Sequence, residues 1–229
     1  MPEGGDMRQL NESTTISIPI GRNAIQGDLL LPADAKGAVI FAHGSGSSRH
    51  SPRNKYVAEI LNQGGLATLL IDLLTLDEER VDNRTAEHRF NIDLLAERLV
   101  AATDWTGAHQ KLSNLHRGYF GASTGAAAAL VAASQRAGVI DAIVSRGGRP
   151  DLAGSALGRV IAPTLLIVGE FDRDVIELNQ QAAKAMHAPT ELQTVPGATH
   201  LFEEPGALEN VASLARTWFD EELIRKQAA

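Results

Sequence analysis

The sequence predicts an α/β fold in which a mostly parallel, doubly wound sheet carries helices on both faces and starts with an antiparallel N-terminal hairpin. Three observations support this prediction. Short continuous apolar runs alternate with helical patterns, two earlier runs alternate apolar and polar residues, and a length of 229 residues suits one α/β domain. We therefore expect a single domain over 1–229, without internal repeats or linkers.

The first two strands are expected to form the hairpin at an edge of the sheet. The runs 14–20 and 25–32 alternate apolar and polar residues on either side of the turn sequence GRNA, which is typical of strands with one face in water. The later apolar runs are continuous, as expected for strands that are buried on both faces of a parallel sheet. They cover residues 37–44, 66–72, 116–123, 141–148 and 162–170, and a last strand is expected at 190–197.

Helical patterns separate these runs, and the clearest one covers residues 51–65. Ser51 is a suitable N-cap, Pro52 fits the first helical position, and glycines follow the last turn. The other predicted helices cover residues 89–106, 124–136, 175–186 and 206–226. Two segments lack such a pattern. We expect 1–12 to be flexible, and the charged segment 73–88 to form either a lid or wall of a site or a solvated connection.

The composition argues against several classes of protein. Hydrophobic residues make up 44% of the chain and charged residues 21%, and no apolar run is long enough to span a bilayer. The formal charge of -7 disfavours nucleic acid and anionic membrane surfaces as partners. The polar, acidic N-terminus lacks the pattern of a secretory signal, and there is no cysteine for a disulfide. We therefore expect a cytoplasmic protein whose partner is a small molecule.

A serine between two glycines is the candidate nucleophile. The stretch GASTG follows an apolar run and precedes a helical pattern, so Ser123 is predicted to lie at a sharp turn from strand to helix. Gly121 and Gly125 would allow the close backbone approach that such a turn requires. The pattern alone is a modest signal, and an isolated serine hydroxyl is a weak nucleophile. A base and an orienting carboxylate must therefore accompany it.

Asp172 and His200 follow Ser123 in the chain order of a Ser-Asp-His triad. Ligands of an open α/β sheet bind beyond the carboxyl ends of the strands, and both residues come soon after predicted strands. Asp172 lies in the stretch GEFDRDV, where Asp174 is the alternative acid, and His200 lies in the loop PGATHLFEEP. Each could be an ordinary loop residue, but their joint placement favours a catalytic role.

Acyl transfer also requires hydrogen-bond donors for the oxyanion of the tetrahedral intermediate. The amide of Thr124, next to Ser123, is one candidate, and the amide of Ser45 in the stretch HGSGSS is the other. His43 begins that stretch and is expected to form hydrogen bonds within the loop rather than to act as a second base. This chemistry requires no metal and no organic cofactor.

The HGSGSS stretch could instead cradle a phosphate, as glycine-rich turns do in dinucleotide-binding domains and P-loops. The spacing argues against both alternatives. Arg49 occupies the place of the third glycine in the GxGxxG pattern, and no Gly-Lys-Ser/Thr follows. A Rossmann dehydrogenase is therefore a weak alternative.

From about residue 16 to the C-terminal helix, the sequence resembles the α/β-hydrolase superfamily and, within it, the dienelactone hydrolase-like group. The resemblance is carried by the stretches HGSGSSRHSPRN, GASTG, VSRGGRPDLAG, LLIVGEFDRDV and PGATHLFEEPG. It implies an α/β-hydrolase fold with Ser123, Asp172 and His200 as the triad. Some bacterial members occur as partners or fusions of phosphoribosyltransferase domains. The resemblance therefore suggests such a domain as a partner, with a homo-oligomer as the alternative.

One departure from the family pattern limits the substrate. Dienelactone hydrolases use a cysteine nucleophile and this chain has no cysteine, so ester hydrolysis is expected rather than the ring-opening of dienelactone. Those enzymes also hold the substrate carboxylate with arginines. Arg146 and Arg149 follow a predicted strand and could do likewise, but the alternative is a structural ion pair near Asp151.

The sequence thus predicts a serine hydrolase that cleaves a small carboxylic ester or lactone through an acyl-enzyme intermediate. Two alternatives would use the same scaffold. One is an acyltransferase with the same triad, and the other is a non-catalytic binding or partner protein. A complete set of triad residues favours catalysis over binding alone.

Overall fold

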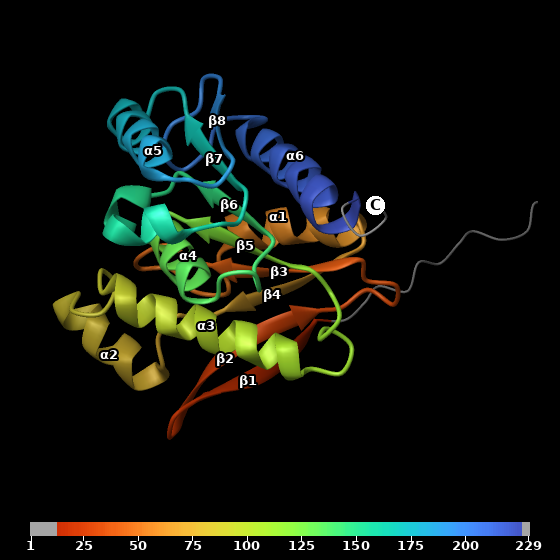
Figure 1. Cartoon of the computed structure of the whole chain (residues 1–229). Helices are drawn as coiled ribbons and strands as arrows, with labels where there is room; N and C mark the ends of the chain where they lie inside the picture. The colour runs from red at the N-terminus through yellow and green to blue at the C-terminus, as the bar shows by residue number, and fades with distance from the viewer. Residues whose placement is uncertain (1–12, 226–229) are drawn as a thin grey trace, which may run out of the picture.

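The computed structural model describes residues 13–225, which form one eight-stranded sheet between two layers of helices (Figure 1). The strands are β1 (Thr14–Ile20), β2 (Asn23–Leu30), β3 (Gly37–Ala42), β4 (Leu66–Ile71), β5 (Arg117–Ala122), β6 (Ala142–Arg146), β7 (Thr164–Gly169) and β8 (Thr190–Val195). The helices are α1 (Pro52–Gln63), α2 (Leu76–Thr85), α3 (Ile92–Ala108), α4 (Thr124–Gln135), α5 (Arg173–Ala185), α6 (Ala207–Phe219), the 3-10 helix η1 (Pro150–Arg159) and the π-helical turn η2 (Asp220–Ile224). The segment 1–12, which the sequence predicts to be flexible, lies outside the described residues.

The strand order is β1-β2-β4-β3-β5-β6-β7-β8, which confirms the predicted fold class. β2 pairs antiparallel with both β1 and β4, and all pairs from β4 to β8 are parallel. The chain winds from β3 to β4 on one side and then to β5 on the other, so the direction of winding reverses at β3. Ala42 pairs with Gly121 where β3 and β5 end. The loops after these two strands therefore lie side by side, at the place where ligands bind in such sheets.

The two faces of the sheet are covered by different helices (Figure 1). α1 and α6 pack together on one face, where Val57, Leu61 and Phe219 are fully buried. α3, α4 and η1 pack on the other face. Residues 126–133 of α4 are all buried, and most of them are alanines, because only small side chains allow this helix to lie so close to the sheet. Within residues 13–225, no helix is both long and apolar enough to cross a membrane.

The charged segment 73–88 contains the helix α2, which the sequence periodicity does not predict. A capping box starts this helix. The Glu78 amide donates to the Thr75 hydroxyl (3.2 Å), and the Thr75 amide donates to the Glu78 carboxylate (2.8 Å). Leu76 and Val81 are exposed, so the helix has no apolar stripe from which it could have been found. Capping hydrogen bonds and ion pairs, rather than apolar burial, hold α2 in place.

Candidate active site

Ser123 lies at a sharp turn between β5 and α4. Its backbone angles are φ 50° and ψ −121°, a strained conformation for a residue other than glycine. The turn is possible because glycines flank it. A Cβ on Gly121 would lie 2.4 Å from the Cα of Ala126, and one on Gly125 would lie 2.5 Å from the carbonyl oxygen of His43. Neither position can hold a side chain, and strain of this kind is typical of functional sites.

Asp172 follows β7 and His200 follows β8, and their side chains meet. His200 Nδ1 lies 2.6 Å from Asp172 Oδ2. Because a carboxylate only accepts hydrogen bonds, Nδ1 carries the proton of the neutral imidazole, and Nε2 is left as a hydrogen-bond acceptor. Asp174, the alternative acid, lies exposed in the first turn of α5. The contact with the histidine is thus made by Asp172.

Hydrogen bonds within the loop after β8 hold His200 in place. The Gly197 amide donates to the Glu170 carboxylate at 2.7 Å, which ties the start of this loop to the end of β7. The Thr199 hydroxyl lies 2.5 Å from Glu204 Oε1, and Phe202 of the same loop is buried. The position of His200 is therefore set by its neighbours on both sides.

Ser123 and His200 line the same cavity, which has a volume of about 200 Å³ and is called the nucleophile cavity below. Ser45 from the loop after β3 also lines this cavity, together with Arg146 at the end of β6 and Arg53 in the first turn of α1. The cavity therefore contains the predicted nucleophile, the predicted base, one predicted oxyanion donor and two guanidinium groups.

Arg146 is buried and has almost no partner for its charge. Its exposed fraction is 8%, and Nε and Nη1 have no hydrogen-bond partner among the described residues. Nη2 lies 3.5 Å from Asn54 Oδ1, at the outer limit of a hydrogen bond. Burial, and to a lesser extent the nearby Arg53 charge, lower the pKa of Arg146 to about 10. The guanidinium thus stays charged at neutral pH while most of its donors remain unused.

Arg149, the other predicted substrate-binding arginine, forms an ion pair instead. Its Nε and Nη2 donate to the two carboxylate oxygens of Asp151 at 2.8 and 2.7 Å. This bidentate hydrogen bonding raises the pKa of Arg149. The contacts of Arg149 therefore match the alternative role, which is a structural ion pair with Asp151. Arg149 is not among the residues that line the nucleophile cavity.

No sequence pattern indicates Arg53 as a residue of the site. Arg53 lies in α1 and does not follow a strand. The expectation that ligands bind beyond the carboxyl ends of the strands therefore does not indicate it. Its Nη1 lies 3.1 Å from Glu203 of the loop that carries His200, and both side chains are partly exposed. Such a pair is weak in water, so Arg53 remains able to contribute positive charge to the cavity.

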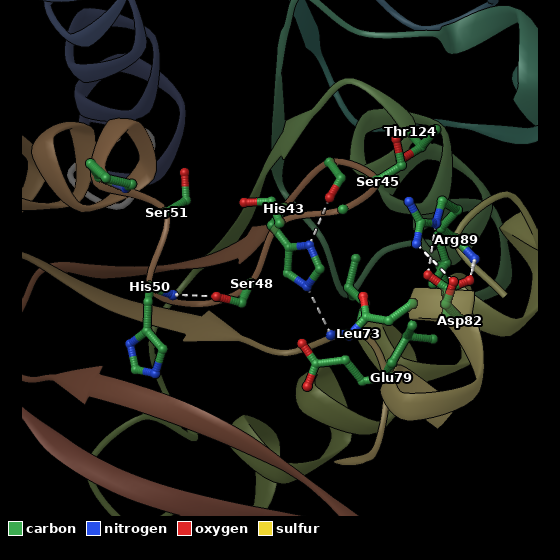
Figure 2. A pocket seen from close by; sticks show the side chains of 17 residues that line it. His43, Ser45, Ser48, His50, Ser51, Leu73, Glu79, Asp82, Arg89 and Thr124 are labelled. Atoms are coloured by element: carbon green, nitrogen blue, oxygen red, sulfur yellow. Dashed lines mark hydrogen bonds and ion pairs between the residues drawn. The ribbon is translucent and has the colours of Figure 1, made fainter. Parts of the chain in front are cut away.

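A larger cavity of about 320 Å³ is also lined by residues of the loop after β3 (Figure 2). Ser45 and Thr124, the two predicted oxyanion donors, both line it, as does His43. Thr124 is the first residue of α4, where backbone amides have no acceptor within the helix. This loop therefore contributes residues, Ser45 among them, to both cavities.

The helix α2 forms one wall of this larger cavity (Figure 2). Asp82 of α2 accepts hydrogen bonds from the amides of His88 and Arg89 and from the Arg89 side chain. Burial opposes ionisation of Asp82, but these donors outweigh it and hold the pKa of this carboxyl below its usual value. The wall is thus held by an ion pair between buried Asp82 and partly exposed Arg89.

The part of the chain that the structure describes contains no group of three or more metal-ligating side chains that could hold a metal ion. Two acidic side chains near the cavities are engaged by hydrogen-bond donors. Asp172 contacts a histidine and Asp82 contacts an arginine.

Comparisons with known proteins agree with this fold. No protein-family model matches the sequence. The crystal structure of a dienelactone hydrolase from Anabaena variabilis ATCC 29413 is 56% identical in sequence, covers 93% of this chain and 98% of its own, and superposes with a TM-score of 0.91. Est1E from Butyrivibrio proteoclasticus shares the fold at 18% identity, with a TM-score of 0.76 and coverage of 91% and 98%.

Two curated proteins of Mycobacterium tuberculosis, from strains CDC 1551 and H37Rv, are also similar and carry the name phosphoribosyl transferase. Each is 55% identical over 208 residues, which is 91% of this chain and 46% of the relative. The chain thus spans about half the length of the curated relatives that it matches.

Proposed function

Since this chain belongs to the dienelactone hydrolase family, we propose that it is a serine hydrolase that cleaves a small carboxylic ester or lactone through an acyl-enzyme. The observation that carries the proposal is the 2.6 Å contact between Asp172 and His200, since His200 lines the same cavity as the strained Ser123. With no cysteine in the chain, a serine takes the place of the thiolate nucleophile.

In the proposed mechanism, Ser123 Oγ attacks the carbonyl carbon while His200 Nε2 accepts the hydroxyl proton. Asp172 stabilises the imidazolium that forms. The carbonyl π electrons move to oxygen, and the amides of Ser45 and Thr124 donate hydrogen bonds to this oxyanion. As the carbonyl re-forms, the bond to the leaving alkoxide breaks and His200 protonates the alcohol. Water then attacks the acyl-enzyme with His200 again as the base, which releases the acid and frees Ser123.

The replacement of Ser123 tests this proposal. Ser123→Ala should lose nearly all activity on a panel of esters with different acyl lengths, because no other hydroxyl is paired with the base in this scheme. Activity that survives in the purified variant would show that another group attacks the ester. Wild-type protein that binds a ligand tightly and turns over no ester of the panel would favour the non-catalytic alternative. Competing alcohols in the same assay separate hydrolysis from acyl transfer.

We further propose that Arg146 binds an anionic group of the substrate. A buried guanidinium with unused donors is unfavourable unless an anion completes its hydrogen bonds, and Arg53 adds positive charge nearby. A carboxylate on the substrate would accept two of these bonds in the usual fork geometry. Arg149 already has a carboxylate partner in Asp151 and does not require an anion from the substrate.

A matched pair of substrates tests the role of Arg146. The p-nitrophenyl esters of succinic acid (as the monoester) and butyric acid have the same acyl length and differ in charge. Arg146→Gln should lower kcat/KM for the charged ester about 10- to 100-fold and change the neutral one little. Arg149→Gln is the control and should leave the ratio between the two esters unchanged. An unchanged ratio in Arg146→Gln would show that the guanidinium has no part in recognising the anion.

A phosphoribosyltransferase domain, or a second copy of the chain, is proposed as a partner, and the location is proposed to be cytoplasmic. The relatives named phosphoribosyl transferase are about twice as long as the matched region, so that name fits the part of those proteins outside the match. Co-purification of this chain with such a domain from cells of its own source would test the partner.

A further inference from the structure

We infer that His43 is a positioning residue, which holds the Gly44–Ser45 peptide so that the Ser45 amide is available to the oxyanion. This inference rests on the proposed function, because it assigns a role to the loop that would stabilise the tetrahedral intermediate. The two hydrogen bonds of the His43 ring support this inference, because they fix where its proton sits (Figure 2).

The backbone amide of Leu73 determines the tautomer of His43. Leu73 N lies 3.1 Å from His43 Nε2, and an amide N–H can only donate. His43 Nε2 must therefore carry a lone pair, and the proton of the neutral imidazole lies on Nδ1. Nδ1 in turn lies 2.9 Å from the carbonyl oxygen of Gly44, which can only accept. Donors and acceptors are thus consistent with one tautomer alone.

Burial keeps His43 in this neutral form. Its exposed fraction is 8%, and burial lowers the pKa of His43, opposed by the Gly44 carbonyl and by the charges of Asp72 and Glu79. A second proton would sit on Nε2, where it would face the Leu73 N–H and break that hydrogen bond. The ring therefore cannot act as a base without losing its place in the loop.

The hydrogen bond to Gly44 orients the amide of Ser45. The carbonyl of Gly44 and the N–H of Ser45 belong to one trans peptide, so they point in opposite directions. The Gly44 carbonyl is held by His43 and also by the Ser47 amide at 3.2 Å. The Ser45 N–H is thereby turned away from the imidazole.

Gly44 also packs directly against the nucleophile. A Cβ on Gly44 would lie 3.1 Å from Ser123 Cβ and 3.8 Å from Ser123 Oγ, so this peptide begins beside the reacting oxygen. Ser45 lines the nucleophile cavity. His43 is not among the residues that line this cavity, and it acts through its hydrogen bond to Gly44, which is why we assign it a positioning role.

Two substitutions at His43 separate positioning from simple packing. In His43→Asn the side-chain amide places a donor near the site of Nδ1, and in His43→Gln it reaches the site of Nε2 instead. We expect His43→Gln to lower kcat about 10²-fold with little change in KM, as for the loss of one oxyanion donor. His43→Asn should keep at least ten times the kcat of His43→Gln. Equal losses of kcat in both variants, or a loss confined to KM, would overturn the inference.

Histidine NMR of the wild-type protein tests the tautomer without any substitution. In ¹⁵N-histidine-labelled protein, His43 should be neutral with its proton on Nδ1 at pH 7. A proton on Nε2 would overturn the inference even if both variants fail to fold. Retention of esterase activity in Ser123→Ala would instead reject the proposed function and leave this spectrum as it is, so the two failures can be told apart.

Discussion

His43 and His200 lie at the carboxyl edge of the same sheet, and their hydrogen bonds give them opposite roles. Each uses Nδ1 to donate to an oxygen, which is a carboxylate oxygen of Asp172 for His200 and the backbone carbonyl of Gly44 for His43. They differ at Nε2, where His43 already accepts a bond from the Leu73 amide. They also differ in exposure, since the His200 side chain is 40% exposed and His43 is buried.

This comparison shows that residue type does not decide which histidine can be a base. A general base needs a free lone pair and a way to bear the charge that it gains. Asp172 supplies a negative charge that would stabilise a protonated His200. The neutral carbonyl of Gly44 would stabilise a protonated His43 much less. His200 can therefore exchange a proton, and His43 can hold a loop.

The largest expected effect comes from replacing the two histidines in turn. His200→Gln removes the proposed base and should lower kcat by about 10⁶-fold on a short p-nitrophenyl ester, as measured by steady-state kinetics. His43→Asn should lower it by about 10-fold at most, since the base remains and the Asn side chain keeps a donor near the site of Nδ1. Equal losses of kcat in the two variants would contradict the different roles assigned to His43 and His200.

The two aspartates near the start of α5 sharpen the comparison further. Asp172→Asn should lower kcat about 10⁴-fold, because an amide can donate to Nδ1 and so stabilise the wrong tautomer of His200. Asp174→Asn is the matched control and should have near wild-type kcat, since this side chain is exposed in the first turn of α5. Similar losses in both variants would mean that the 2.6 Å contact has no catalytic consequence.

The smallest expected effect is on stability as the pH falls. The pKa of His43 is lowered in the folded protein, so the unfolded chain binds a proton more readily below about pH 6.5. The free energy of unfolding should therefore fall between pH 7.5 and pH 5, and it should fall less in His43→Asn, which cannot take up this proton. Urea unfolding at both pH values measures the difference. An equal fall in the free energy of unfolding in the wild-type protein and in His43→Asn would show that His43 is not held neutral.

Much of this architecture could be predicted from the sequence because its signals are local. Continuous apolar runs indicated the parallel strands, and GASTG indicated the turn at Ser123, whose strain and close packing follow from its two glycines. The residues after each run then indicated where a site would form, since parallel strands bring their carboxyl ends to one edge. The contact between Asp172 and His200 follows that logic.

The remaining features depend on contacts between distant residues. Arg53 reaches the nucleophile cavity from a helix, and the buried state of Arg146 depends on the packing around it, so neither has a local signal. α2 lacks an apolar stripe, so its periodicity does not predict a helix, although Thr75 and Glu78 form a capping box that could have indicated its start. The partner of His43 Nε2 is a backbone amide 30 positions away, which no motif encodes.

The most direct test of the central claim is to label the wild-type protein with a fluorophosphonate and to locate the adduct by peptide mass spectrometry. We predict one adduct on Ser123, formed at least a thousandfold more slowly in His200→Gln and not formed in Ser123→Ala. The claim would be contradicted by an adduct on Ser45, Ser47 or Ser48 of the neighbouring loop, by the absence of any adduct, or by equally fast labelling in His200→Gln.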